Sequence, residues 1–259
     1  MKIAFFDSGL GGITVLDEAM RRMPQEDFLY FADTAHVPYG TKSKEEVLTF
    51  VKQSVDTIIQ DEIKALVIAC NTATSIAIAE LRNIYNMPII GMEPAVKPAL
   101  EMNRGSGLRV LVFATPLTLK EAKYRELVSR IDDMGMVDSL PLPELVEFCE
   151  NLELEGARMA DYFLSKLKDY DLRTYGTVVL GCTHYPFYKR LLSQILPAHI
   201  QIVDGSRGTV NRLIQVLQES DQLQGAGSSN VRWMCSNSDP AYLQKMQKAL
   251  AFLQAAPHS

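Results

Sequence analysis

Two cysteines lie in matching sequence settings in which a thiol can act as a base. Cys70 follows the apolar run 65–69, Cys182 follows the apolar run 177–181, and hydroxyl or amide side chains come directly after each. A thiol where a helix begins lies near unpaired N–H groups and the positive end of the helix dipole, which favours the thiolate. A lone buried cysteine is more often a small apolar core residue. Two of them in one setting indicate a shared chemical role.

A glycine-rich segment follows the first apolar run. It reads Asp7-Ser8-Gly9, with further glycines at positions 11 and 12. Glycines let the backbone approach a ligand closely, and the N–H groups of a helix start can bind an anion. The spacing is neither a dinucleotide fingerprint nor a P-loop. We therefore expect a substrate carboxylate here, with Asp7 orienting a neighbour or accepting a proton; a tight capped turn is the alternative.

Polar side chains in two other loops are further candidates. Pro38-Tyr39-Gly40 places a phenol on a rigid turn, with the Gly40 N–H free to bind. Thr115 and Thr118 follow the apolar run 109–113, where their hydroxyls could bind a ligand or cap a helix. Taken alone, each feature is also consistent with an ordinary turn or cap.

One histidine and one glutamate complete the candidates. His184 comes two residues after Cys182, where it could exchange a proton with the thiol or with a substrate ammonium group. A structural histidine is the alternative. Glu147 has no distinguishing spacing, and Cys149 and Cys235 lack a strand-end setting, so these two cysteines receive no role.

The elements that must position these residues alternate between short apolar runs and longer segments of helical period. This alternation predicts a mostly parallel sheet covered by helices. A helix is expected from Ser43, which forms a capping-box pair with Glu46, and another from Asp239-Pro240. The predicted strands are 2–6, 28–32, 65–69, 88–91, 109–113, 177–181, 200–203 and 231–234.

The chain is expected to form two domains. Prolines and glycines gather in segments 92–107 and 204–208, which predicts that the chain crosses from one domain to the other there. The outer domain is then 1–95 plus 206–259, and 96–205 is inserted. Because ligands bind outside the carboxyl ends of strands in open α/β sheets, both cysteines are expected to face one crevice.

Composition narrows the class of protein. The chain has 259 residues, 47% of them hydrophobic, and a net charge of −5 without a basic stripe, so no nucleic-acid partner is expected. No run reaches the ~18 apolar residues that would span a membrane, and the first apolar run is too short for a signal peptide. A cytoplasmic protein with free thiols is expected. Nothing predicts a metal or another cofactor, since Cys/His clusters and a nucleophile elbow are lacking.

Together these motifs resemble one family. Asp7-Ser8-Gly9, Pro38-Tyr39-Gly40, Cys70-Asn71-Thr72 and Cys182-Thr183-His184, in this order and at these separations, are similar to glutamate racemases of the aspartate/glutamate racemase superfamily, over nearly the whole chain. The resemblance implies two pseudo-symmetric, doubly wound α/β domains with the active site in the cleft between them. It also implies a homodimer that uses no cofactor and supplies D-glutamate for peptidoglycan.

The resemblance further implies roles for the candidates. Cys70 deprotonates D-glutamate and Cys182 deprotonates L-glutamate from the opposite face, assisted by Asp7, His184 and Glu147. The family usually has a proline three residues before the matching glutamate, whereas Pro143 stands four before Glu147. Activation by a cell-wall precursor is not expected, since the chain begins almost at the first strand. The implied substrate-binding residues are Asp7, Ser8, Pro38, Tyr39, Gly40, Asn71, Thr72, Thr115, Thr118, Thr183 and His184.

Three other functions stay open at this stage. A racemase for aspartate or another acidic amino acid needs the same α-carbon chemistry. A thiol redox protein would join the two cysteines in a disulfide and show dithiol-linked turnover. A non-catalytic ligand-binding module is disfavoured because both bases are present.

Overall fold

The computed structural model describes residues 1–223 and 227–255. The strands are β1 (Lys2–Asp7), β2 (Phe28–Ala32), β3 (Ile63–Ile68), β4 (Ile89–Gly91), β5 (Arg109–Ala114), β6 (Val137–Pro141), β7 (Tyr175–Leu180), β8 (Gln201–Asp204) and β9 (Val231–Cys235). The α-helices are α1 (Ile13–Arg22), α2 (Lys44–Ile58), α3 (Asn71–Ile84), α4 (Val96–Met102), α5 (Pro116–Lys120), α6 (Ala122–Ile131), α7 (Glu144–Glu150), α8 (Ala157–Leu167), α9 (Lys189–Ile195), α10 (Ser206–Glu219) and α11 (Pro240–Ala255). Short 3₁₀ helices are η1 (Tyr39–Thr41), η2 (Leu172–Thr174) and η3 (Tyr185–Tyr188).

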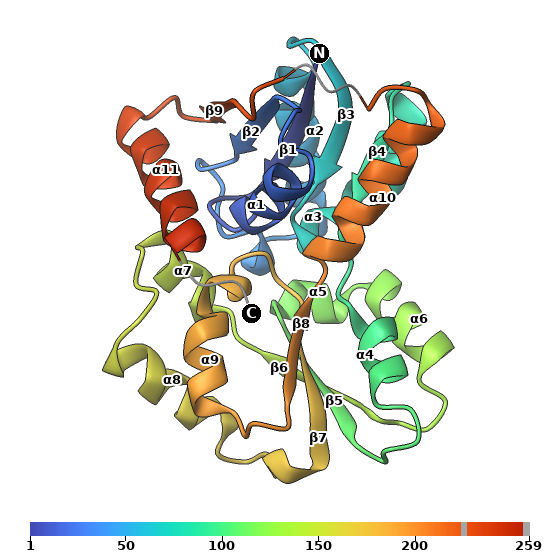
Figure 1. Cartoon of the computed structure of the whole chain (residues 1–259), viewed down its shortest axis with the longest axis vertical. Coiled ribbons are helices and arrows are strands. Elements are labelled where there is room, and N and C mark those ends of the chain that lie inside the picture. The colour runs from blue at the N-terminus through green and yellow to red at the C-terminus, as the bar shows by residue number, and fades with distance from the viewer. Residues whose placement is uncertain (224–226, 256–259) are drawn as a thin grey trace.

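The strands form two parallel sheets, drawn one above the other in Figure 1. The first has the order β4-β3-β1-β2-β9 and the second the order β6-β5-β7-β8. Read from the other edge, β8-β7-β5-β6 repeats the order β4-β3-β1-β2. The expected pair of pseudo-symmetric α/β units is therefore confirmed. Within the described residues, β9 has no equivalent in the second sheet.

Strand register makes the two cysteines structurally equivalent. Ala65 of β3 and Thr177 of β7 each pair with the second residue of the neighbouring strand, just after a register shift. Cys70 and Cys182 both lie five positions further along. The two matching sequence settings of Cys70 and Cys182 thus correspond to equivalent positions in the two sheets.

The inner strands β1, β3, β5 and β7 are buried on both faces, which explains their nearly continuous apolar runs. Successive residues of β1 point to opposite faces: Phe5 joins the core with Leu16 of α1, whereas Phe6 joins the core with Val51 of α2. The first of these cores continues to the second sheet, where it includes Phe113 of β5. The two halves therefore share apolar contacts as well as chain connections.

All eight predicted strands are present, with ends that differ by at most two residues. The sequence did not predict β6, because this edge strand reads Val-Asp-Ser-Leu-Pro and is half exposed, so it needs no apolar run. Both predicted helix starts are confirmed. Ser43 and Glu46 form the capping box of α2, and Asp239 accepts from the Ala241 N–H at the start of α11.

The chain passes from the first sheet to the second between β4 and β5, and returns between β8 and α10, which packs on α1. Both passages overlap the segments that were predicted as crossings. The domain limits 1–95 plus 206–259 and 96–205 stay a prediction. No helix in the described ranges is long and apolar enough to span a bilayer.

Candidate active site

A narrow cavity lies where the carboxyl ends of strands from both sheets meet. Its free space is about 10 Å³, roughly that needed by one water molecule. Segments after β1, β2 and β3 contribute from the first sheet, and segments after β5, β6 and β7 contribute from the second. The lining residues are Ser8, Pro38, Tyr39, Gly40, Cys70, Asn71, Thr72, Thr115, Val146, Cys182, Thr183 and His184.

Cys70 is the N-cap residue of α3, as the sequence predicted. Its sulfur accepts a hydrogen bond from the Ala73 N–H at 3.4 Å, and its thiol donates to the Ser8 hydroxyl at 3.9 Å. Burial raises the pKa of the Cys70 thiol, and the nearby Asp7 carboxylate raises it further. These influences favour the protonated form of Cys70.

Cys182 has a different environment. It precedes the 3₁₀ helix η3, so the expected helix start is a 3₁₀ turn on this side. Its sulfur lies 3.7 Å from Nδ1 of His184, whose Nε2 lies 2.8 Å from Oε1 of Glu150. Burial alone would lower the pKa of His184, but the hydrogen bonds to Cys182 and Glu150 raise it well above 6.5. A protonated His184 donates from both nitrogens and places a positive charge beside the sulfur.

Glu150, at the end of α7, takes the place that was predicted for Glu147. Its Oε1 also accepts the Leu10 N–H at 2.7 Å, and its Oε2 accepts the Tyr242 hydroxyl at 2.6 Å. Burial would raise the pKa of Glu150, yet the hydrogen bonds from His184, Tyr242 and Leu10 hold it below the usual value. Glu147 is exposed on the same helix and does not line the cavity.

The two glutamates differ in how they lie relative to the cavity. Glu150 lies four residues after Val146, which lines the cavity, so the two share one side of α7. Glu147 follows Val146 directly, which turns it by about 100° around the helix axis, and its side chain is exposed. Because Glu147 and Glu150 are only three residues apart and are neighbours on the helix surface, helical period in the sequence does not distinguish them.

Asp7 lies fully buried behind the lining residues. Its carboxylate accepts the Gly9 N–H at 3.0 Å and the Thr183 hydroxyl at 2.9 Å. Burial raises the pKa of Asp7, although the nearby charge of His184 lowers it in part. Asp7 thus orients Thr183, and through its charge it acts on Cys70 and His184.

Three threonines join the halves beside Cys70. The Thr72 hydroxyl lies 3.1 Å from the hydroxyl of Thr115 and 3.0 Å from that of Thr118. Thr115 also caps α5 through the Thr118 N–H, so the cap interpretation is confirmed for this residue, and its role in ligand binding stays a prediction. Thr118 supports the lining residues from outside the cavity. The buried Asn71 amide has no hydrogen-bond partner among the described residues, so both of its polar atoms can serve a ligand.

The Pro38–Tyr39–Gly40 turn is fixed against the same cavity. The Tyr39 hydroxyl donates to the buried Asp33 carboxylate at 2.5 Å, and His36 Nδ1 lies 2.9 Å from the same group. A side chain at Gly40 would meet Thr115, with a Cβ 2.6 Å from the threonine Cβ. The turn therefore presents backbone rather than a side chain at Gly40.

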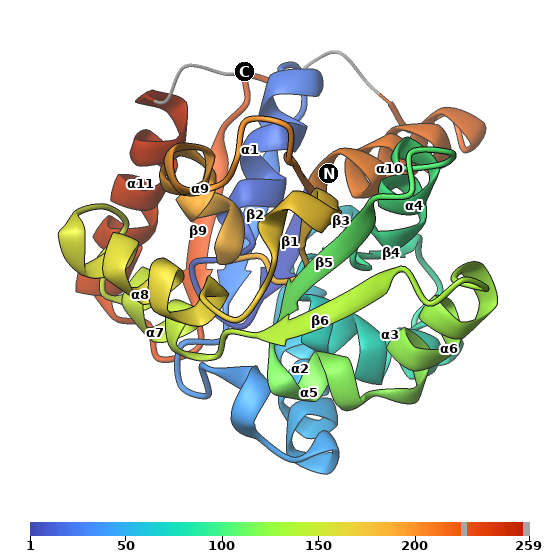
Figure 2. The same cartoon turned by 90° about the horizontal axis from the view of Figure 1, so that it is seen from below.

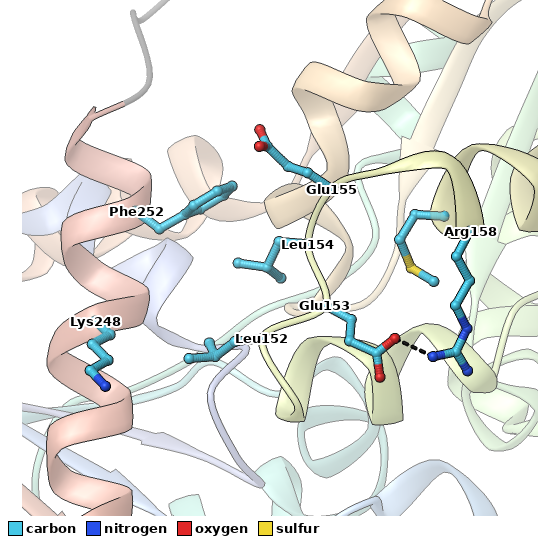
Figure 3. A pocket seen from close by; sticks show the side chains of 8 residues that line it. Leu152, Glu153, Leu154, Glu155, Arg158, Lys248 and Phe252 are labelled. Carbon is cyan, nitrogen blue, oxygen red and sulfur yellow. Dashed lines mark hydrogen bonds and ion pairs between the residues drawn. The ribbon is translucent and has the colours of Figure 1, made fainter.

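A second cavity lies between α11 and segment 152–159 (Figure 3). It has a volume of about 400 Å³, and the Glu153–Arg158 ion pair stands at its edge. It contains no thiol, so it lies outside the two-cysteine site. In residues 1–223 and 227–255, no group of three or more His, Cys, Asp or Glu side chains is arranged to hold a metal ion.

Comparison with known proteins agrees with this geometry. The family described as Asp/Glu/Hydantoin racemase matches residues 12–213. A glutamate racemase of Halothermothrix orenii is 50% identical over 229 residues, which is 88% of this chain and 90% of the relative. Glutamate racemase 2 of Bacillus subtilis is 45% identical over 262 residues, covering 100% of this chain and 98% of the relative.

A solved structure extends the similarity to three dimensions. Escherichia coli glutamate racemase, in complex with L-glutamate and the activator UDP-MurNAc-Ala, superposes with a TM-score of 0.84 at 28% identity. The match covers 96% of this chain and 95% of that chain.

Proposed function

Because the chain belongs to the Asp/Glu/hydantoin racemase family, we propose that it interconverts L- and D-glutamate by proton transfer between substrate and two thiols, Cys70 and Cys182. The observation that supports this mechanism best is the placement of equivalent cysteines from the two sheets on one cavity. Inversion at a carbon through a planar carbanion needs a base on one face and an acid on the other. A thiolate and a thiol meet this need without a third group.

In the L-to-D direction, the Cys182 thiolate removes the α-proton of L-glutamate and becomes a thiol. The electron pair of the broken C–H bond stays on the α-carbon, as a carbanion conjugated with the carboxylate. The Cys70 thiol then donates its proton to the opposite face, which yields D-glutamate and leaves a Cys70 thiolate. The D-to-L direction reverses each step, so protons and charge balance.

The residues around the thiols stabilise the two charge states. The imidazolium of His184 stabilises a thiolate at Cys182, and Glu150 holds the imidazolium in place. Burial and the nearby Asp7 charge both disfavour a second thiolate at Cys70. One sulfur is thus ready to accept a proton and the other to donate one.

The remaining lining residues bind the substrate. An amino-acid α-proton is far less acidic than a thiol, so the site must stabilise the developing negative charge, at about 1.4 kcal/mol for each tenfold in rate. The Asn71 amide, the hydroxyls of Ser8, Thr72 and Thr183, and the N–H groups around Gly40 are the proposed donors and acceptors.

The proposal extends to the cellular role. The product D-glutamate serves peptidoglycan synthesis, and the enzyme works in the cytoplasm as a homodimer. Similarity to curated glutamate racemases along most of the chain supports the first point. Light scattering after size-exclusion chromatography tests the dimer, and a monomer that retains full activity would contradict it.

Circular dichroism of the amino acid tests the function directly. Purified protein with L-glutamate should bring the signal to zero, and L-aspartate under the same conditions should change much more slowly. Faster turnover of aspartate would favour the aspartate racemase alternative. Turnover that is linked to the oxidation or reduction of a dithiol would favour the redox alternative.

Single cysteine variants test the mechanism. Cys70→Ala and Cys182→Ala should each abolish racemisation, whereas Cys235→Ala should not, because that thiol contacts Asn237 away from the cavity. In deuterated water, residual exchange of the α-proton should be confined to D-glutamate in Cys182→Ala and to L-glutamate in Cys70→Ala. Full racemisation by either single variant contradicts the two-thiol mechanism.

A further inference from the structure

The unit formed by β9 and α11 interrupts the pseudo-symmetry of the two halves. β9 adds to the edge of the first sheet beside β2, and α11 packs on α1. Figures 1 and 2 both show α11 extending to the helices of the second half. There the Phe252 ring stacks on Phe187 of η3, with ring centroids 6.3 Å apart. One helix thus contacts both halves.

On this helix, two side chains hold Glu150. Tyr242 is 8% exposed, and its hydroxyl donates to Oε2 of Glu150 at 2.6 Å. One turn later, Lys245 Nζ donates to the backbone carbonyl of Glu150 at 3.0 Å. Among the described residues, Tyr242 is the partner of Oε2, while Oε1 is taken by His184 and the Leu10 N–H.

We propose that Tyr242 is a positioning residue for the racemisation, which acts on Cys182 through Glu150 and His184. The contacts form one chain, from the Tyr242 hydroxyl to Oε2, from Oε1 to Nε2 of His184, and from Nδ1 to the Cys182 sulfur. The inference rests on the proposed function, because it assigns the imidazolium a task in thiol proton transfer. Within the described residues, the second sheet has no strand equivalent to β9. The hydrogen bonds of the Cys70 thiol are instead with the Ser8 hydroxyl and the Ala73 N–H.

The hydrogen bond from Tyr242 to Glu150 matters because both side chains are largely shielded from water. A carboxylate oxygen without a partner in a buried site is costly, so without the donor Glu150 either turns towards water or gains a proton. In both cases the imidazolium loses its counter-charge. The titratable groups that act on His184 are Cys182, Glu150 and Asp7, and Glu150 alone among them contacts Tyr242.

Tyr242→Phe keeps the ring and removes the hydroxyl. We expect kcat to fall roughly tenfold with KM changed less than about twofold, as for the loss of one hydrogen bond to a charged group. The alkylation profile, which is the rate at which iodoacetamide modifies each cysteine at one fixed pH, supplies a second readout. Cys182 should react more slowly than in the wild type, because the imidazolium beside it is held less firmly, and Cys70 should react at the wild-type rate.

Tyr85→Phe is a matched control. It deletes a tyrosine hydroxyl that also donates to a carboxylate at 2.6 Å, on Asp56, far from the cavity. This variant should leave kcat and both alkylation profiles unchanged. In the Glu150→Gln background, Tyr242→Phe should add little to the loss, because the hydroxyl acts through that carboxylate.

The outcomes separate the two proposals. An unchanged Cys182 profile in a folded Tyr242→Phe protein overturns the positioning role, even if kcat falls. Equal shifts at Cys70 and Cys182 overturn it as well. A shifted Cys182 profile in a protein that does not racemise glutamate supports the chain of contacts and contradicts the proposed function instead.

Discussion

At the scale of single residues, the two thiols have the same position but different neighbours. Cys70 accepts one N–H and lies near a carboxylate, whereas Cys182 lies near an imidazole that a second carboxylate keeps charged. Two-thiol racemisation requires this difference, since a pair of thiolates has no proton to donate and a pair of thiols has no base. In the proposed mechanism, the neighbouring charges therefore make Cys182 the starting base and Cys70 the starting acid for L-glutamate.

The contribution of Glu150 can be separated from that of Glu147 on the same helix. Glu150→Gln should lower kcat about ten- to hundredfold, because the imidazolium loses a charged partner at 2.8 Å. Glu147→Gln, an exposed change three residues earlier, should have no effect. Steady-state kinetics of both variants check this. Equal losses would show that helix α7, rather than the carboxylate at 150, is what activity needs.

The His184–Glu150 pair also predicts how stability depends on pH. The pKa of His184 is raised above 6.5, so its contribution is complete below about pH 6.5 and is lost as the pH rises through the folded-state pKa. The pKa of Glu150 is lowered below 4.5, so its contribution is complete above about pH 4.5 and is lost as the pH falls.

Between these limits both contributions are present. Urea unfolding of wild type and His184→Asn should therefore show a larger difference in unfolding free energy at about pH 6 than at about pH 9. A difference that grows towards pH 9 would contradict a raised pKa.

At the scale of elements, the turn between β1 and α1 depends on glycines because it packs against the second half. A Cβ on Gly11 would clash with Oγ1 of Thr183 and would lie 2.5 Å from Nδ1 of His184. Gly11→Ala should displace the imidazole and lower kcat by about a hundredfold, as small misplacements of catalytic groups do.

Gly208→Ala is the matched substitution, in helix α10, where a Cβ meets nothing within 4 Å. It should leave activity unchanged and raise the unfolding free energy by about 0.5–1 kcal/mol, because alanine loses less backbone entropy in a helix. Chemical unfolding and kinetics of both variants check the pair. Wild-type activity in Gly11→Ala would show that the turn can move away from His184.

Elements also show how far sequence reasoning extends. Apolar runs identified the strands that carry Cys70 and Cys182, since each of these strands is buried on both faces. The same reasoning could not find β6, whose alternate residues face solvent. The role of Glu147 followed from the family resemblance alone, and the helical period does not distinguish Glu147 from its neighbour Glu150. The contact between Tyr242 and Glu150 joins residues 92 positions apart, and no local pattern encodes it.

At the scale of the whole molecule, the cavity between the sheets is too small for an amino acid. About 10 Å³ of free space holds roughly one water molecule, so we expect glutamate binding to require that the lining side chains rearrange or the two halves move apart. The passages between β4 and β5 and between β8 and α10 connect the two halves and are where such a movement would bend the chain. The shared core beside α11 limits its extent.

Hydrogen exchange can follow this movement. Saturation with D-glutamate should slow exchange in segments 8–12, 70–74 and 182–186, because in the proposed site the ligand contacts both halves at once. A separate cavity lies at the amino ends of β5 and β6 and is lined in part by segments 103–108 and 132–136. Exchange in these two segments should not change. Protection confined to one half would contradict a site shared between them.

The helix that braces Glu150 on one side has a consequence for repeated cycles. L- and D-glutamate have equal free energy in water. However, α11 acts through Glu150 and His184 on Cys182, the thiol proposed to deprotonate only L-glutamate. Under the proposals above, an L-to-D cycle leaves the molecule prepared for the mirror-image amino acid. Before the enzyme can deprotonate L-glutamate again, the negative charge must return from the Cys70 sulfur to the Cys182 sulfur. The resting enzyme is therefore prepared for only one of the two enantiomers, although the equilibrium constant of the reaction favours neither.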